Sequence, residues 1–270
     1  MLGLDVAFRR DCSLVLGALL IGLAGGSLAV KADVRPAQAC EVTADLARLT
    51  LPLTHVAERV AAGQPVKIVA IGSSSTAGTG ASSSASSYPS RLEVELRTRF
   101  PRLLVSVLNR GVAGEEAPQM VARFDQAVVA EKPDLVIWQV GTNALLHDSA
   151  MAALTDTVRY GIDRLKEIGA DVIVIDPQFV PRVIAKPDTE RLVDSLSAST
   201  KLENVNLFRR FAVMRYWSEA NHVPFEQFVA PDGLHMNDWG YQCMAKLLAA
   251  AISDAATRIP QTAHVPTMAR

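Results

Sequence analysis

The chain has 270 residues, of which 49% are hydrophobic and 20% are charged. This composition can bury one large core, so we expect a single domain once a leader has been removed. The formal net charge is -1, with 27 Lys and Arg residues against 28 Asp and Glu residues. Binding to nucleic acid requires clustered positive charge to neutralise phosphates, and we therefore expect no nucleic-acid partner.

Residues 1–39 are predicted to be a leader and linker. Arg9 and Arg10 precede an apolar run over residues 12–30, and residues 37–39 offer the small-x-Ala pattern that signal peptidases accept. We therefore expect export to the periplasm or the cell exterior, followed by cleavage. The alternative is an uncleaved membrane anchor, because the apolar run approaches the length of a spanning helix. Contact with a membrane is expected only in that case.

Two of the three cysteines would remain in the exported chain. Cys12 would leave with the leader, whereas Cys40 and Cys243 would enter an oxidising compartment. They could form a disulfide between the N-terminal segment and the last helix, or stay unpaired. The sequence leaves both open because it does not show whether their α-carbons approach within about 7 Å.

Alternating apolar patterns organise the rest of the chain. Residues 40–65 are interpreted as an N-terminal helical segment, because apolar residues recur at helical spacing until Gly63-Gln64-Pro65. Short apolar runs predict strands over residues 66–71, 103–108, 134–140, 171–175 and 205–208. Helical spacing predicts helices over residues 88–100, 117–131, 151–168, 188–201, 209–221 and 239–256. Residues 66–258 would form the main domain and 259–270 a tail.

Strands that are apolar throughout and separated by helices indicate a parallel sheet buried on both faces. We therefore expect an α/β fold, a three-layer α/β/α sandwich with a sheet of about five strands. In such sheets, ligands bind outside the carboxyl ends of the strands. Three polar or glycine-containing segments follow predicted strands, at residues 72–76, 109–114 and 141–143, and a fourth begins at Asp176.

Asp232-Gly-Leu-His235 precedes the last predicted helix and supplies an acid and a base. The spacing allows Asp232 to hold one imidazole nitrogen of His235 while the other nitrogen faces a substrate. An Asp and a His at this spacing also occur by chance. The serine cluster of residues 73–75 adds a nucleophile, although serines after a strand also serve as turn and helix-capping residues.

The four segments Gly72-Ser-Ser-Ser-Thr76, Asn109-Arg-Gly-Val-Ala-Gly114, Gly141-Thr-Asn143 and Asp232-Gly-Leu-His235 resemble the four blocks of the SGNH hydrolase superfamily, the GDSL esterases and lipases. The resemblance spans residues 66–256. It implies a flavodoxin-like fold, with Ser74 as nucleophile, His235 as base and Asp232 as the acid that orients it. Ser73 stands where the family has Asp, and Ala144 stands where Asp usually follows the block-three asparagine.

The resemblance also implies an oxyanion hole made of the backbone N–H groups of Ser74 and Gly114 and the side-chain amide of Asn143. Donors of this kind must be in place where negative charge develops during acyl transfer. Gly114 also fits a turn that needs positive φ, and Asn143 also fits a capping position after a strand. At Gly114 the two roles are compatible, whereas for Asn143 the capping role is an alternative to the catalytic one.

The sequence says less about the substrate. Gln178 and Phe179, after the fourth predicted strand, are candidates for substrate contacts. We expect no cofactor and no metal, since His147 and Asp148 supply too few ligands for a zinc site.

We expect a serine esterase that cleaves a carboxylic ester through an acyl-enzyme. Its substrate would be a small molecule or a polysaccharide, with O-acetyl groups on carbohydrate as one class. The alternatives are an O-acyltransferase with the same triad and a non-catalytic carbohydrate-binding protein on the same fold. The oligomeric state stays open.

Overall fold

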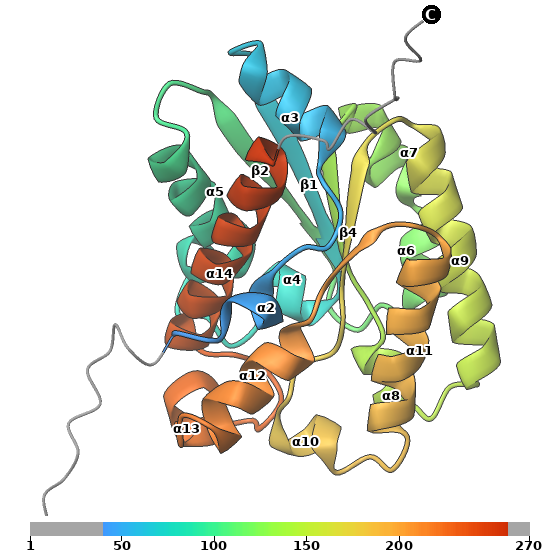
Figure 1. Ribbon diagram of the computed structural model, residues 1–270. Coiled ribbons are helices and arrows are strands. Elements are labelled where there is room, and N and C mark those ends of the chain that lie inside the picture. Colours follow the sequence, from blue (N-terminus) through green and yellow to red (C-terminus); the bar gives the residue numbers. More distant parts are fainter. Residues whose placement is uncertain (1–39, 259–270) are drawn as a thin grey trace, which may run out of the picture. The chain divides into compact units, whose positions relative to one another are not determined.

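The computed structural model describes residues 40–258 of the chain (Figure 1). The predicted leader, residues 1–39, and the predicted tail, residues 259–270, lie outside the described residues. Between residues 40 and 258, no helix has both the length and the apolar character needed to cross a membrane.

A five-stranded parallel sheet forms the centre of the described part. The strands are β1 (Val66–Gly72), β2 (Val105–Gly111), β3 (Leu135–Gln139), β4 (Asp171–Ile175) and β5 (Asn206–Phe208). Their order across the sheet is β2-β1-β3-β4-β5, which is the order of flavodoxin-like folds. The direction of winding reverses between β1 and β3, and ligand sites of such sheets lie beyond the carboxyl ends of the strands at this reversal.

Helices cover both faces of the sheet, which confirms the predicted three-layer α/β/α sandwich (Figure 1). On one face α14 (Asp238–Thr257) packs against α5 (Tyr88–Arg99) and α3 (Thr54–Ala61). On the other face α9 (Met151–Glu167) packs against α6 (Ala117–Ala122) and α11 (Thr189–Leu202).

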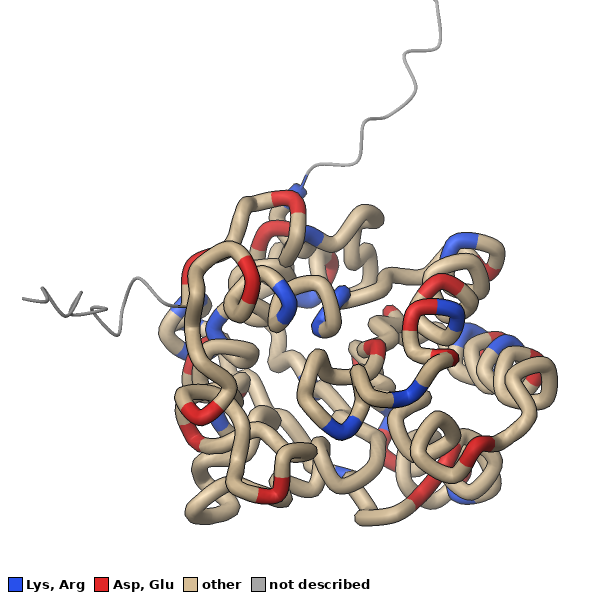
Figure 2. Tube along the Cα trace, turned by 90° about the horizontal axis from the view of Figure 1, so that it is seen from below, with Lys and Arg blue, Asp and Glu red and all other residues tan. Residues whose placement is uncertain are grey.

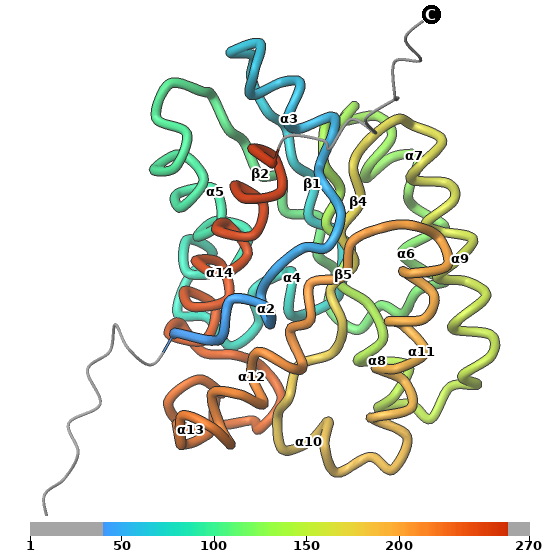
Figure 3. The backbone as a smooth tube through the Cα atoms, viewed as in Figure 1, coloured from blue at the N-terminus to red at the C-terminus, as the bar shows by residue number. Residues whose placement is uncertain are grey.

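Short helices lie at the carboxyl ends of the strands. Figure 3 shows α4 (Ser74–Ala77), α8 (Thr142–Leu146), α10 (Pro181–Ile184) and α13 (Phe225–Phe228) at the same end of the sheet. The remaining helices are α2 (Ala44–Ala47), α7 (Phe124–Ala127) and α12 (Arg210–Glu219), with 3₁₀ turns at Ser84–Ser86 and Val129–Glu131. Sequence periodicity did not predict α4, α8, α10 and α13, because four or five residues are too few to show a helical repeat.

The core is tightest around β3, where all five residues are buried. Trp138 is fully buried, and its indole N–H donates to the sulfur of Met120 at 3.2 Å. Gly161 of α9 faces the same indole, and a Cβ atom at this position would lie 2.4 Å from the Trp138 ring. Glycine therefore allows α9 to pack directly on the sheet.

Two predicted helices are interrupted in the structure. The helix expected over residues 117–131 ends at Ala122, and a new helix, α7, begins at Phe124. The break lies at Arg123, whose backbone has φ -110° and ψ 11°. Its side chain contacts residues far away in the sequence, and local periodicity does not reveal such contacts.

The N-terminal segment is also not one helix. Residues 40–65 contain the short α2 and α3, separated by an extended stretch that includes Pro52. Proline disfavours helical backbone at the residue before it, so a continuous helix is interrupted here. Leu49 and Leu53, which lie between α2 and α3, are buried, at 0% and 1% exposure.

Cys40 and Cys243 form a disulfide, with their α-carbons 5.2 Å apart. The bond links the start of the described chain to α14, and α2 packs against the same helix (Figures 1 and 3). Of the two alternatives that the sequence left open for these cysteines, the structure therefore shows the paired one.

Candidate active site

The four sequence segments meet at the carboxyl ends of the strands, the edge of the sheet onto which Figure 2 looks. Acidic and basic residues are interspersed over this side of the described chain (Figure 2). Ser74 begins α4 directly after β1, and the loop that holds Asp232 and His235 leads into α14. Asn237 caps that helix by accepting a hydrogen bond from the backbone N–H of Gly240 at 3.0 Å.

Ser74, His235 and Asp232 form a continuous chain of hydrogen bonds. The Oγ atom of Ser74 lies 2.8 Å from Nε2 of His235, and Nδ1 of His235 lies 2.5 Å from Oδ2 of Asp232. This arrangement fits the tautomer in which Nδ1 carries the proton and Nε2 accepts from the serine hydroxyl. Histidine in this state can remove a proton from the serine.

Asp232 is held in its ionised form. Partial burial raises the pKa of this carboxyl, but hydrogen bonds from the His235 side chain and from the backbone N–H groups of His235 and Leu234 outweigh it. The resulting pKa is about 2. The two backbone N–H groups donate to Oδ1 at 2.9 and 3.0 Å, which leaves Oδ2 for the imidazole. A fixed negative charge at this position favours an imidazolium that forms during reaction.

The structure distinguishes the three neighbouring serines. Ser73 and Ser75 are each 2% exposed, whereas Ser74 is half-buried and contacts His235. Ser73 is occupied elsewhere, since its Oγ donates to Oε1 of Gln139 at 3.0 Å. Of these three, Ser74 is the hydroxyl that combines access with a base.

Gln139, at the end of β3, braces the turn that presents Ser74. Its Oε1 accepts hydrogen bonds from the backbone N–H of Ser73 at 3.0 Å, from Ser73 Oγ and from Thr76 Oγ1 at 3.3 Å. Gly72 makes room for this contact, because a Cβ there would lie 2.9 Å from Gln139 Oε1. Sequence reasoning missed Gln139. The available signal was a polar residue inside an otherwise apolar strand.

Two of the three predicted oxyanion donors, Gly114 and Asn143, belong to segments that contact each other. Gly114 is exposed and has φ +84°, with open space where a Cβ would be. Asn143 is the second residue of α8 and is 8% exposed. Its Nδ2 donates to the carbonyl of Glu115 at 2.8 Å. An amide nitrogen carries two hydrogens, so one remains for a ligand.

Gln178 is a link between loops. It is 1% exposed, its Oε1 accepts from Thr142 Oγ1 at 2.9 Å, and its Nε2 donates to the carbonyl of Leu234 at 3.1 Å. Both ends of the amide are therefore engaged, and the residue joins the Asn143 helix to the His235 loop. A direct contact between Gln178 and substrate stays a prediction.

Phe179 is packed among other aromatic rings. It is 8% exposed, with its ring centroid 5.2 Å from that of Phe211 and 5.9 Å from that of Phe225. A direct contact between Phe179 and substrate stays a prediction.

Two buried titratable side chains, Asp176 and Arg210, lie near the end of β4. Asp176 Oδ1 accepts from the backbone N–H of Phe211, and Arg210 Nε donates to the Asp176 carbonyl, both at 2.9 Å. Burial raises the pKa of Asp176 to about 7 and lowers the pKa of Arg210 to about 10.

Within residues 40–258, no three His, Cys, Asp or Glu side chains are grouped as a metal site would require.

Comparison with known proteins shows the family. Residues 39–258 match the model of the Non-GDSL lipase-like family. This description agrees with Ser73 standing where a GDSL motif has Asp. No curated protein sequence is significantly similar to the chain.

Several solved structures share the fold. A two-domain esterase (CEX) active on acetylated mannans, co-crystallised with mannopentaose, has a TM-score of 0.66 and 17% identity, covering 78% of this chain and 56% of that chain. The chain thus spans little more than half the length of that esterase. LAE5, an alpha/beta hydrolase enzyme from the metagenome of Lake Arreo, Spain, has a TM-score of 0.60 and 22% identity, covering 72% of this chain and 97% of that chain.

A catalytic mutant of Axe2, an acetylxylan esterase from Geobacillus stearothermophilus, has a TM-score of 0.60 and 17% identity, covering 70% of this chain and 95% of that chain. At such identities these structures show a common fold. The family match, in contrast, covers most of the sequence and includes all four blocks. The chain therefore belongs to the Non-GDSL lipase-like family.

Proposed function

We propose that the protein is a serine esterase that removes small acyl groups, with O-acetyl groups on carbohydrate as its substrate class. The observation that carries the proposal is the hydrogen-bonded chain from Ser74 through His235 to Asp232. A serine hydroxyl is a weak nucleophile until a base removes its proton, and an oriented imidazole supplies that base.

The reaction proceeds in two halves. Ser74 Oγ attacks the ester carbonyl while its proton passes to Nε2 of His235, and Asp232 stabilises the imidazolium. The N–H groups of Ser74 and Gly114 and the amide of Asn143 receive the oxyanion. The tetrahedral intermediate then collapses, and the alcohol leaves with the proton from His235. Water, deprotonated by His235, hydrolyses the acyl-enzyme and releases the carboxylic acid.

The surroundings of His235 support a carbohydrate ester. A hollow of about 500 Å³ is lined by Gly80, Ala81, Ser82, Glu226, Gln227, Asn237, Asp238 and Trp239. Gly80 brings it next to the base, because a Cβ there would lie 2.9 Å from the His235 Cβ. A half-buried indole beside carboxylates and amides can stack on a sugar ring and bind its hydroxyls.

A second hollow, of about 360 Å³, shares Glu226 and Asn237 with the first. Two of the structures with this fold are esterases described as active on acetylated mannans or acetylxylan. A polysaccharide chain would occupy both hollows with its acetyl group at Ser74.

We also propose that the protein is exported. The predicted leader motivates this proposal, and the Cys40–Cys243 disulfide supports it because disulfides persist in oxidising compartments.

The test compares the wild type with Ser74→Ala and Ser75→Ala on 4-nitrophenyl acetate and on acetylated xylo- and manno-oligosaccharides, with acetate release as the readout. Ser74→Ala should lower kcat by at least about 10³-fold, whereas Ser75→Ala, the neighbouring serine, should retain most activity. Full activity of Ser74→Ala would rule out the mechanism. The same assay is repeated with an added sugar acceptor. Transfer of acetyl groups to this acceptor in place of water would indicate an acyltransferase.

A further inference from the structure

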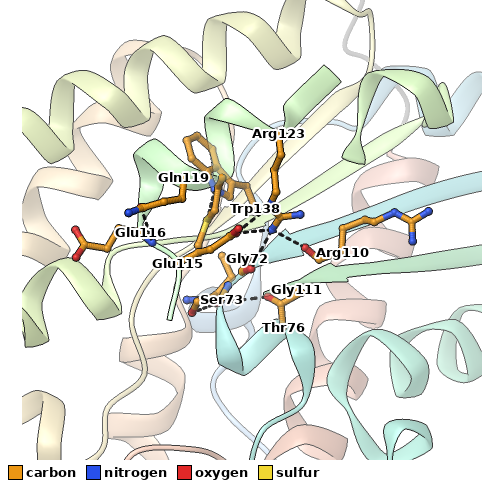
Figure 4. A network of polar contacts seen from close by, with 12 residues as sticks. Gly72, Ser73, Thr76, Arg110, Gly111, Glu115, Glu116, Gln119, Arg123 and Trp138 are labelled. Carbon is orange, nitrogen blue, oxygen red and sulfur yellow. Dashed lines mark hydrogen bonds and ion pairs between the residues drawn. The ribbon is translucent and has the colours of Figure 1, made fainter. Parts of the chain in front are cut away.

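Arg123 lies at the break between α6 and α7 and contacts the loop that carries Gly114. Its Nε and Nη2 atoms donate to Oε2 of Glu115 at 2.8 and 2.6 Å. The two side chains are 20% and 15% exposed. Figure 4 shows the pair next to the ends of β1 and β2. An ion pair with this degree of burial is better shielded from solvent and salt than an exposed one.

The same guanidinium binds the ends of two strands. Nη2 of Arg123 donates to the carbonyl of Arg110 at 2.8 Å and, at a longer 3.5 Å, to the carbonyl of Gly72 (Figure 4). The carbonyl of Gly72 also accepts from the backbone N–H of Val112 at 3.0 Å. Arg123 therefore connects Glu115 to strand β1 two residues before Ser74.

These contacts hold both ends of one tight turn. The turn spans residues 112–115 and is closed by a hydrogen bond from Glu115 N–H to the carbonyl of Val112 at 3.4 Å. Val112 is tied to Gly72, and Glu115 is tied to Arg123. Gly114, between them, is exposed and makes no close packing contact at its Cβ position. The position of the Gly114 N–H thus depends on the two anchored ends.

Glu115 also orients the third oxyanion donor. Its carbonyl accepts the hydrogen bond from Asn143 Nδ2. A shift of Glu115 would therefore displace the Gly114 N–H and the Asn143 amide together. Donors of an oxyanion hole are effective only when they are held in place before the reaction, and a displacement of about 1 Å can reduce the rate 10²-fold.

We propose that Arg123 is a positioning residue that sets the geometry of the oxyanion hole through its ion pair with Glu115. The inference rests on the proposed function, because it assigns Arg123 a role in the reaction at Ser74. Arg123 acts through Glu115, with which it forms the ion pair. Loss of this ion pair should therefore weaken binding of the transition state, and so lower kcat, more than it weakens binding of the substrate.

The experiment measures kcat and KM for 4-nitrophenyl acetate in Arg123→Gln and Glu115→Gln. Each should lower kcat by about 10- to 100-fold with KM changed by less than about 3-fold. The affinity for a boronic acid, which forms a tetrahedral adduct with the serine, should fall in parallel with kcat/KM. The double variant should be little worse than either single variant, because both remove the same interaction.

Arg159→Gln is the matched control. Arg159 lies on α9 and forms an ion pair with Glu203, with Nε 2.8 Å from Oε1. Neither residue belongs to the four sequence segments of the candidate site. This variant should keep the wild-type kcat and boronic acid affinity. Active-site titration with a phosphonate normalises each kcat to the folded enzyme, and Glu115→Gln tests the same contact if Arg123→Gln folds poorly.

Wild-type kcat and boronic acid affinity in both variants would overturn the inference. So would a loss confined to KM, which would indicate a role in substrate binding. Failure of the proposed function has a different signature, since Ser74→Ala would then be as active as the wild type. An inactive Ser74→Ala together with a fully active Arg123→Gln would reject only the positioning role.

Discussion

Ser74 Oγ lies 2.8 Å from His235 Nε2, although the two residues are 161 positions apart in the chain. The contact forms because the turn after β1 and the loop before α14 meet at the same edge of the sheet. Each of the loops involved is braced by a polar side chain from another element. Gln139 binds the backbone N–H of Ser73, next to the nucleophile. Gln178 binds the carbonyl of Leu234, next to His235. Arg123 binds the side chain of Glu115, next to Gly114.

Asp232→Asn should lower kcat by about 10³- to 10⁴-fold. The amide would no longer stabilise an imidazolium at His235, and it could favour the wrong tautomer. Because the pKa of Asp232 is about 2, this carboxyl stays ionised in an assay at pH 5 to 8. The rate ratio of wild type to variant should therefore be large throughout this range. A kcat within 10-fold of the wild type would show that Asp232 is dispensable.

Gln139→Met should destabilise the protein by about 1–3 kcal/mol, because the buried N–H of Ser73 and the hydroxyl of Thr76 lose a shared acceptor. It should also lower kcat, since the serine turn loses its brace. Urea unfolding measures the stability. Gln242→Met serves as a control, because Gln242 binds Glu95 near the surface and its loss should cost less than about 0.5 kcal/mol. Equal losses of stability in the two variants would show that Gln139 does not brace the turn that presents Ser74.

Reduction of the Cys40–Cys243 disulfide should lower the free energy of unfolding by about 2–4 kcal/mol, because the bond joins residues 203 positions apart. Thermal unfolding with and without dithiothreitol measures the effect. Cys243→Ala should be less stable than the wild type and should not respond to the reductant. An unfolding midpoint of the wild type that is the same in both conditions would show that the bond does not contribute.

Asp176 predicts a dependence of stability on pH. Burial raises the pKa of this carboxyl to about 7, above its value in an unfolded chain. The folded protein therefore binds more protons than the unfolded chain between about pH 4 and pH 7, and its free energy of unfolding falls as the pH rises through this window.

Asp176→Asn removes this ionisation and keeps an oxygen that can accept from the Phe211 N–H. Relative to the wild type, the variant should gain about 1–3 kcal/mol between pH 5 and pH 8. Urea unfolding at the two pH values measures the difference. A stability difference that does not change with pH would contradict the raised pKa.

Much of the fold could be predicted from the sequence because its strands are short apolar runs with helices between them. The five strands and their surrounding helices follow that pattern, and the family match and the sheet order agree with it. The helix predicted over residues 117–131 was wrong because Arg123 contacts Gly72 and Arg110 in other strands. Local periodicity contains no information on such contacts.

The candidate site could be predicted in part. Ser74, His235 and Asp232 lie together, as expected from four motifs that follow strands or precede the last helix. Gln178 lies at the predicted edge of the sheet, but its role as a link between two loops was not predicted, because the sequence does not show which way a side chain points. Its partners, Thr142 and the Leu234 carbonyl, come from two other loops.

Labelling with a fluorophosphonate, followed by fragmentation of the modified peptide in a mass spectrometer, identifies the nucleophilic serine directly. Such reagents bond to a serine that a neighbouring base activates. We expect one adduct per chain, located on Ser74, and no adduct in Ser74→Ala. An adduct on Ser73, Ser75 or a serine outside the turn, or an unlabelled wild-type protein that still hydrolyses esters, would contradict it.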